Sequence, residues 1–169
     1  MDLSSSGGTG SLPRTTTVML LVALGSCAGQ GTGEERTAQM VESEVETFLG
    51  AYRTAIDAKQ IERLRTMYVD DGRFRWIEDG QVRYRSPEDV MAALAALPND
   101  AGIQTEYENT EVTVVGTRSA SAGSTFRTTM GEGPSAYSFG GMITMVLEQG
   151  AEGWRIVEGH TSSFRDQGR

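Results

Sequence analysis

The stretch that decides the fold is residues 67–85, with the sequence MYVDDGRFRWIEDGQVRYR. Within it, Asp70-Asp71-Gly72 supplies turn chemistry that ends the segment before it. Apolar and polar residues then alternate over residues 73–77 and again over 81–85, which is the period of a β-strand. Between these two runs lies Asp79-Gly80, a dipeptide that favours a tight hairpin turn. The stretch therefore predicts a turn followed by a β-hairpin.

On the N-terminal side of this hairpin the hydrophobic period is that of a helix. A continuous apolar stripe is formed by Val41, Val45, Phe48, Leu49, Tyr52 and Ile56. A second, short helix is predicted after Asp57, with Ile61, Leu64 and Met67 on one face. After the hairpin, Ser86-Pro87-Glu88-Asp89 is typical of a helix N-terminus, with Ser86 as the N-cap and Asp89 completing a variant capping box. This third helix is predicted to stop at Pro98.

The remaining sequence is strand-like. Four strands are predicted, at residues 103–115, 119–130, 136–148 and 154–163, with glycine-rich turns between them. Three helices followed by a run of strands indicate an α+β domain, with the helices packed on one face of a strongly curved antiparallel sheet. We predict that this domain covers residues 39–165 and that residues 166–169 form a C-terminal tail.

Composition excludes several classes of function. The 169 residues carry 23 acidic and 15 basic side chains, for a net charge of −8, and the basic residues form no stripe. Because binding to nucleic acid depends on Lys and Arg contacts to phosphates, we expect no nucleic-acid partner. One cysteine and one histidine cannot build a Cys/His zinc site, so we expect neither a metal nor a cofactor.

The N-terminus has the pattern of a bacterial export signal. Residues 18–24 form an apolar run too short to span a bilayer, and Arg14 is its positive flank. The run closes on Leu24-Gly25-Ser26-Cys27, which resembles a lipobox, so residues 1–27 are predicted to be a lipoprotein-type signal peptide. Cys27 would then carry the lipid, residues 28–38 would form a flexible tether, and the lipid would be the chain's membrane contact in the cell envelope. The alternative is a disordered leader with a coincidental cysteine.

Taken together, the element order, the motif Met67-Tyr68-Val69-Asp70-Asp71 and the terminal segment at 154–162 resemble the nuclear transport factor 2-like superfamily. The chain looks most like its bacterial SnoaL-like and DUF4440-type single-domain members. The resemblance implies a cone, in which a bent sheet wraps the first helix and leaves an apolar pocket. Members include ketosteroid isomerases, polyketide cyclases and dehydratases, whereas others are binding or dimerising modules. It also implies a homodimer through the outer face of the sheet, to which Tyr137 and Phe139 would contribute.

The resemblance further implies where a pocket site would lie. Aligned through Tyr68-Val69-Asp70-Asp71, Tyr52 takes the place of the isomerases' oxyanion tyrosine. Their general base falls on Trp76, and their second acid falls near Ile143. A tryptophan side chain cannot accept a proton, so the ketosteroid-isomerase mechanism is not expected, and whether the chain is an enzyme stays open.

The last predicted strand supplies a second set of candidates. If its side chains alternate strictly, Trp154, Ile156, Glu158, His160 and Ser162 share one face, which the resemblance makes the pocket face. His160 ordinarily titrates near neutral pH, so a Glu158–His160 pair opposite Tyr52 is a candidate acid/base site. The candidate ligand-binding residues are Trp76, Phe48, Met142 and Trp154. The alternatives are a hydrogen-bonded wall role for His160 and ordinary core packing for Tyr52 and the tryptophans.

Two functional hypotheses follow. In the first, an envelope-anchored domain binds a small apolar or aromatic molecule in its cone, with acid/base turnover of the isomerase, cyclase or dehydratase kind left open. In the second, a filled cone belongs to a non-catalytic dimerising or interaction module. The arginines Arg73, Arg75, Arg83 and Arg85 are expected to form a solvated face or cross-strand pairs with Glu78 and Asp79, with an anion site as the alternative.

Overall fold

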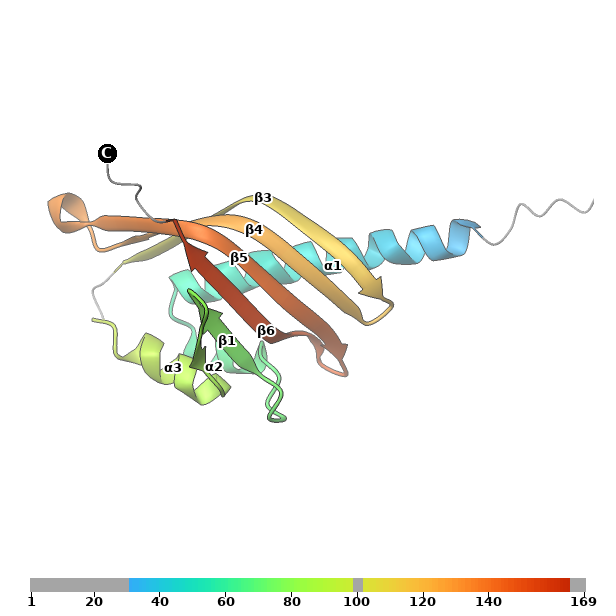
Figure 1. Ribbon diagram of the computed structural model, residues 1–169, viewed down its shortest axis with the longest axis horizontal. Coiled ribbons are helices and arrows are strands. Elements are labelled where there is room, and N and C mark those ends of the chain that lie inside the picture. The colour runs from blue at the N-terminus through green and yellow to red at the C-terminus, as the bar shows by residue number, and fades with distance from the viewer. Residues whose placement is uncertain (1–30, 99–101, 165–169) are drawn as a thin grey trace, which may run out of the picture.

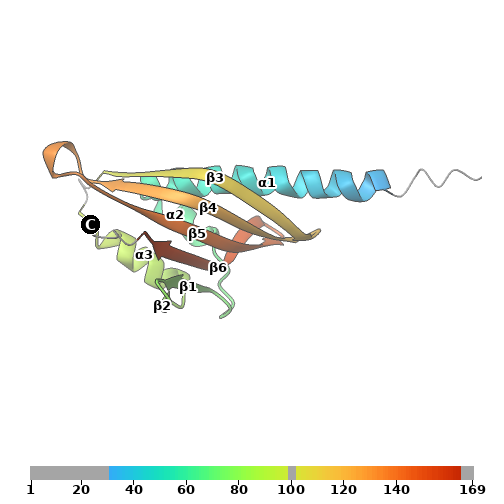
Figure 2. The same ribbon diagram turned by 45° about the horizontal axis from the view of Figure 1, so that its top comes forward.

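A layer of helices covers the concave side of a curved six-stranded sheet (Figures 1 and 2). The computed structural model describes residues 31–98 and 102–164. The helices are α1 (Gly31–Asp57), α2 (Ile61–Thr66) and α3 (Pro87–Ala95), and a 3-10 turn at Gly133–Ser135 joins two strands. The strands are β1 (Arg75–Glu78), β2 (Gln81–Tyr84), β3 (Ile103–Gly116), β4 (Ser119–Met130), β5 (Tyr137–Gly150) and β6 (Gly153–Ser163). The predicted α+β class and cone are confirmed.

The sheet is mixed, whereas the sequence predicted a purely antiparallel one. Its strand order is β2-β1-β6-β5-β4-β3, and β1 runs parallel to β6 while the other neighbours are antiparallel. The difference arises because β1 pairs with a strand far away in the sequence as well as with its hairpin partner. Local turn signals do not report such long-range pairing.

The local predictions around the hairpin are confirmed. Asp79 and Gly80 have φ values of 46° and 82°, as a tight turn between antiparallel strands requires. At the start of α3, the Ser86 hydroxyl accepts a hydrogen bond from the Asp89 backbone, and the Asp89 carboxylate accepts one from the Ser86 backbone. This reciprocal pair satisfies amides that a helix start leaves without partners.

Helix α1 begins earlier than the sequence indicated. It starts at Gly31, so residues 31–38, which were expected to belong to a flexible tether, are helical. The predicted signal peptide with Cys27, the start of the tether and the predicted tail lie outside the described residues. Within the described part, no helix is long and apolar enough to cross a membrane.

The core lies between α1 and the concave face of the sheet. Val45 and Leu49 on α1 are buried, and across from the helix the concave face contributes Ala120, Ala122, Met145, Leu147 and Ile156. The small side chains of Ala120 and Ala122 let the helix approach the sheet closely. This half of the cone is therefore filled by side chains. The space that remains in the cone lies toward the C-terminal end of α1.

Tyr137 and Phe139 lie on the concave side of the sheet, not on the outer face as expected. They pair with Met130 and Thr128 of β4, and residues directly opposite each other point to the same face. Both are exposed, because this end of β5 extends beyond the helix layer. The outer face instead carries Met142 and Val146.

Candidate functional site

The open half of the cone encloses a cavity of about 240 Å³, called the cone cavity here. Its walls come from α1, β1, the end of α3 and the concave ends of the long strands. The lining residues are mostly aromatic or aliphatic: Tyr52, Ile56, Trp76, Leu94, Leu97, Ile103, Tyr107, Phe126, Met130, Phe139 and Ile143, with Glu78, Thr105, Thr128 and Thr161 as the polar ones. A largely apolar cavity with a few polar groups is the usual form of a small-molecule site.

Tyr52 places a phenol in this cavity. It lies on the buried stripe of α1, and its hydroxyl is 2.9 Å from the hydroxyl of Tyr68. Burial raises the pKa of both tyrosines above the ordinary value, so both stay protonated at neutral pH. Either hydroxyl can be the donor in this bond, and where Tyr68 donates, Tyr52 keeps its own proton for an acceptor in the cavity.

Trp76 forms a wall of the cavity because of a glycine beneath it. The ring lies against Gly159 of β6, where a Cβ atom would come within 2.2 Å of two ring carbons. Only a residue without a side chain fits there. Tyr52, Trp76 and Ile143 all line the same cavity, so the resemblance located the pocket correctly. Their functional roles stay predictions.

Glu158 and His160 do not line the cavity, contrary to the prediction. In the pairing of β5 with β6, Leu147 is opposite Ile156 but Val146 is opposite Glu158, so Val157 is an extra residue, a β-bulge. The bulge reverses the alternation, so Gly159 and Thr161 point inward and His160 is exposed. Glu158 forms an ion pair with Arg75. The predicted acid/base pair is therefore outside the pocket.

The other predicted ligand-binding residues also lie elsewhere. Phe48 and Trp154 line a more open groove of about 470 Å³ between α1 and the β5–β6 turn. There the Trp154 indole donates a hydrogen bond of 3.0 Å to Glu44, which also accepts one from Gln149. Met142 is 47% exposed on the outer face. None of the three contributes to the cone cavity.

Sequence reasoning missed two functional groups of the cavity. Tyr107 of β3 lines it, and burial raises the pKa of its phenol, with the nearby Asp57 acting in the same direction and Arg53 against it. Glu78 of β1 brings a carboxylate to the cavity wall. Glu78 could have been found, since it alternates with Trp76 on the same strand. Tyr107 could not, because nothing local marks it among the other residues of a long strand.

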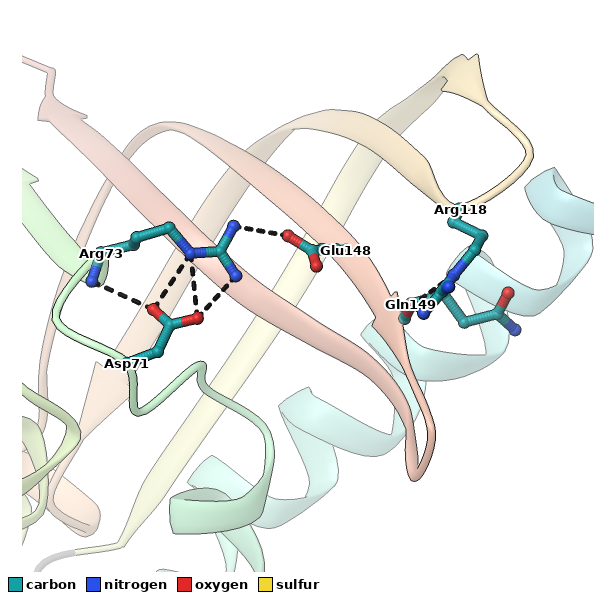
Figure 3. Close-up of polar contacts among 5 residues, drawn as sticks. All are labelled: Asp71, Arg73, Arg118, Glu148 and Gln149. Atoms are coloured by element: carbon teal, nitrogen blue, oxygen red, sulfur yellow. Dashed lines mark hydrogen bonds and ion pairs between the residues drawn. The ribbon is translucent and has the colours of Figure 1, made fainter.

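Of the hairpin arginines, Arg83 forms the predicted kind of pair with Glu78, whereas Arg73 and Arg75 pair with carboxylates that the sequence did not indicate. Arg83 lies 3.7 Å from Glu78, and Arg75 pairs with Glu158 of the neighbouring strand. Arg73 bridges two carboxylates, with a nitrogen 2.6 Å from Asp71 and another 2.7 Å from Glu148 of β5 (Figure 3). The Arg73 guanidinium lowers the pKa of both carboxyl groups below their ordinary values. These exposed pairs fasten the loop before β1 to the sheet.

The fold agrees with the comparisons with known proteins. Residues 40–160 match the model of the SnoaL-like domain, so the chain belongs to this family. The match does not test the DUF4440-type likeness, which stays a prediction. A comparison with curated proteins found no match.

Solved structures show the same fold at low sequence identity. A candidate scytalone dehydratase from Novosphingobium aromaticivorans has 12% identity and a TM-score of 0.70, covering 78% of this chain and 89% of that one. A candidate dehydratase of the NTF2-like family from Streptomyces avermitilis has 16% identity and a TM-score of 0.65, covering 75% and 98%. The structure of LinA has 15% identity and a TM-score of 0.65, covering 78% and 90%.

Proposed function

We propose that this chain binds a small, mostly apolar or aromatic molecule in the cone cavity. The observation that supports the proposal most directly is that the cone is hollow beside Tyr52 and Trp76, where a simple interaction module would be filled by side chains. The volume of the cone cavity, about 240 Å³, is slightly smaller than the smallest typical ligand pockets, which have volumes of roughly 300 Å³. A ligand of one or two rings is therefore the expected size.

The polar groups of the cavity favour a ligand that carries an oxygen acceptor. The Tyr52–Tyr68 pair can donate one hydrogen bond to a carbonyl or hydroxyl group, because both phenols stay protonated. Binding is better supported than turnover. Trp76 occupies the position of the isomerases' general base, and the bulge in β6 turns His160 away from the cavity.

The test is a pair of substitutions at neighbouring positions of β6. Thr161 points into the cone cavity, whereas Ser162 is exposed on the other side of the strand. With the full chain and 2-naphthylmethanol as the probe, titration calorimetry should detect binding to the wild type and to Ser162→Trp. Thr161→Trp should bind at least about tenfold more weakly, because the indole occupies the site. Equal affinities of the two variants would contradict the proposal, as would no binding to the wild type.

We also propose that the chain is exported and held at the bacterial envelope by a lipid on Cys27. The support is the apolar run at 18–24 and the lipobox-like sequence that follows it. Cys27→Ser should move the protein from the membrane fraction to the soluble fraction in a bacterial host. Unchanged partitioning would refute the anchor.

A homodimer is compatible with ligand binding, since it would use the other side of the sheet. We propose that two copies associate through the outer face, where Met142 and Val146 are 47% and 42% exposed. Apolar side chains left exposed on a sheet are common at association surfaces.

A further inference from the structure

The charge distribution of the cone cavity points to a particular chemical class of ligand. Glu78 is the one charged side chain among the described residues that line it, and no lysine, arginine or histidine does so. The hydroxyls of Thr105 and Thr128 bond to each other, and Tyr52 bonds to Tyr68. The cavity therefore offers one negative group in surroundings that are otherwise neutral.

The Glu78 carboxylate is available to a ligand. Its partner Arg83 lies 3.7 Å away, beyond hydrogen-bonding distance, and the two side chains are 43% and 63% exposed. Exposed ion pairs of this kind are weak and easily rearranged. Arg83 itself does not line the cavity, and its guanidinium lies over the ring of Tyr84. A donor group on a ligand can thus replace Arg83 at little cost.

The rest of the wall also suits a cation. Aromatic rings of five residues line the cavity: Tyr52, Trp76, Tyr107, Phe126 and Phe139. The faces of such rings attract ammonium groups, most strongly where water is excluded. An anion would meet these faces and the Glu78 carboxylate with no basic side chain in the wall to compensate. Of the flanking charges, Asp57 and Arg53 oppose each other near Tyr107.

We propose that the cone cavity selects an apolar or aromatic ligand that carries an ammonium group and discriminates against carboxylates. The ring system occupies the apolar part of the cavity, and the ammonium group binds the Glu78 carboxylate. This inference rests on the proposed function, since it concerns the ligand of the same cavity. It makes Glu78 the specificity-determining residue.

Three probes with one ring system test the proposal: 2-naphthylmethylammonium, 2-naphthylmethanol and 2-naphthoate, titrated into the full chain. We expect the ammonium probe to bind at least about tenfold more tightly than the carboxylate, with the alcohol between them. Glu78→Gln should reduce that ratio to about threefold or less. Glu158→Gln is the matched control, because it removes the same charge outside the cavity and should leave the ratio unchanged.

The outcomes separate this inference from the proposed function. If the alcohol binds but the two charged probes bind equally, selection by charge is refuted while the cavity remains a ligand site. The same conclusion follows if Glu78→Gln and Glu158→Gln change the ratio to the same extent. If no probe binds to the wild type, the proposed function fails, and the inference fails with it.

Discussion

At the scale of single residues, the wall of the cone cavity depends on Gly159. A Cβ atom there would lie 2.2 Å from two carbons of the Trp76 ring, far inside van der Waals contact. We therefore expect Gly159→Ala to displace the ring and to lower the free energy of unfolding by about 1–3 kcal/mol, as overpacking does. Denaturant unfolding measures the stability, and tryptophan fluorescence reports the displaced ring.

Gly123→Ala is the control for this substitution. Gly123 is also a strand glycine, on β4, but a Cβ atom added to it would have no neighbour within 4 Å. Its replacement should change the stability by no more than about 0.5 kcal/mol. Equal destabilisation by the two variants would mean that strand glycines matter here for their backbone freedom and not for the contact with Trp76.

At the scale of elements, strand β6 marks the limit of sequence-based prediction. Strict alternation of its side chains would place Trp154, Glu158 and His160 on one face. The bulge at Val157 exists because β5 pairs out of step there, and that pairing is a property of two strands together. The adjacent apolar residues Ile156 and Val157 break the alternation there, but they do not show which residue is left unpaired, so the prediction for His160 was wrong.

Elements with local signals were predictable. The hairpin turn at Asp79-Gly80 and the capping box at Ser86 each need only adjacent residues, and both were predicted correctly. Tyr52 and Trp76 were located because the resemblance aligned whole elements. Tyr107 and Thr161 face the cavity through the registers of long strands, which the sequence does not encode locally.

The loop before β1 is fastened to β5 by Arg73, and this link should weaken in acid. Arg73 lowers the pKa of Asp71 and of Glu148 in the folded protein. A lowered folded-state pKa stabilises the fold at a pH above the unfolded value, and this stabilisation is lost as the pH falls through the folded value. The loss should therefore occur from about pH 4 downward, where free carboxyl groups begin to take up protons.

Arg73→Gln tests this link. The variant should be less stable than the wild type at pH 7, and the difference should shrink toward pH 3 as both carboxylates become protonated. Arg63→Gln is the control, because Arg63 is exposed and donates to the neutral side chain of Gln60. Unfolding curves across this pH range measure the difference. A gap that stays constant with pH would show that Arg73 acts through packing and not through its charge.

At the scale of the whole molecule, the two sides of the sheet differ in what covers them. Helices cover the concave side and leave the cone cavity, whereas no helix among the described residues covers the outer side (Figures 1 and 2). Met142 and Val146 are exposed there, four residues apart on β5 and therefore on one face. With a net charge of −8, chains repel one another at long range, so an association must gain its free energy from such apolar contacts.

The proposed dimer makes the outer face testable without touching the cavity. Val146→Glu places a charge on that face, and burying unpaired carboxylates at an interface opposes association. We expect sedimentation velocity to find a dimer for the wild type and a monomer for Val146→Glu. Met40→Glu is the matched control, because Met40 is 59% exposed on α1, which covers the concave side of the sheet, and should leave the dimer intact. A monomeric wild type, or dissociation by both substitutions alike, would refute an interface on this face.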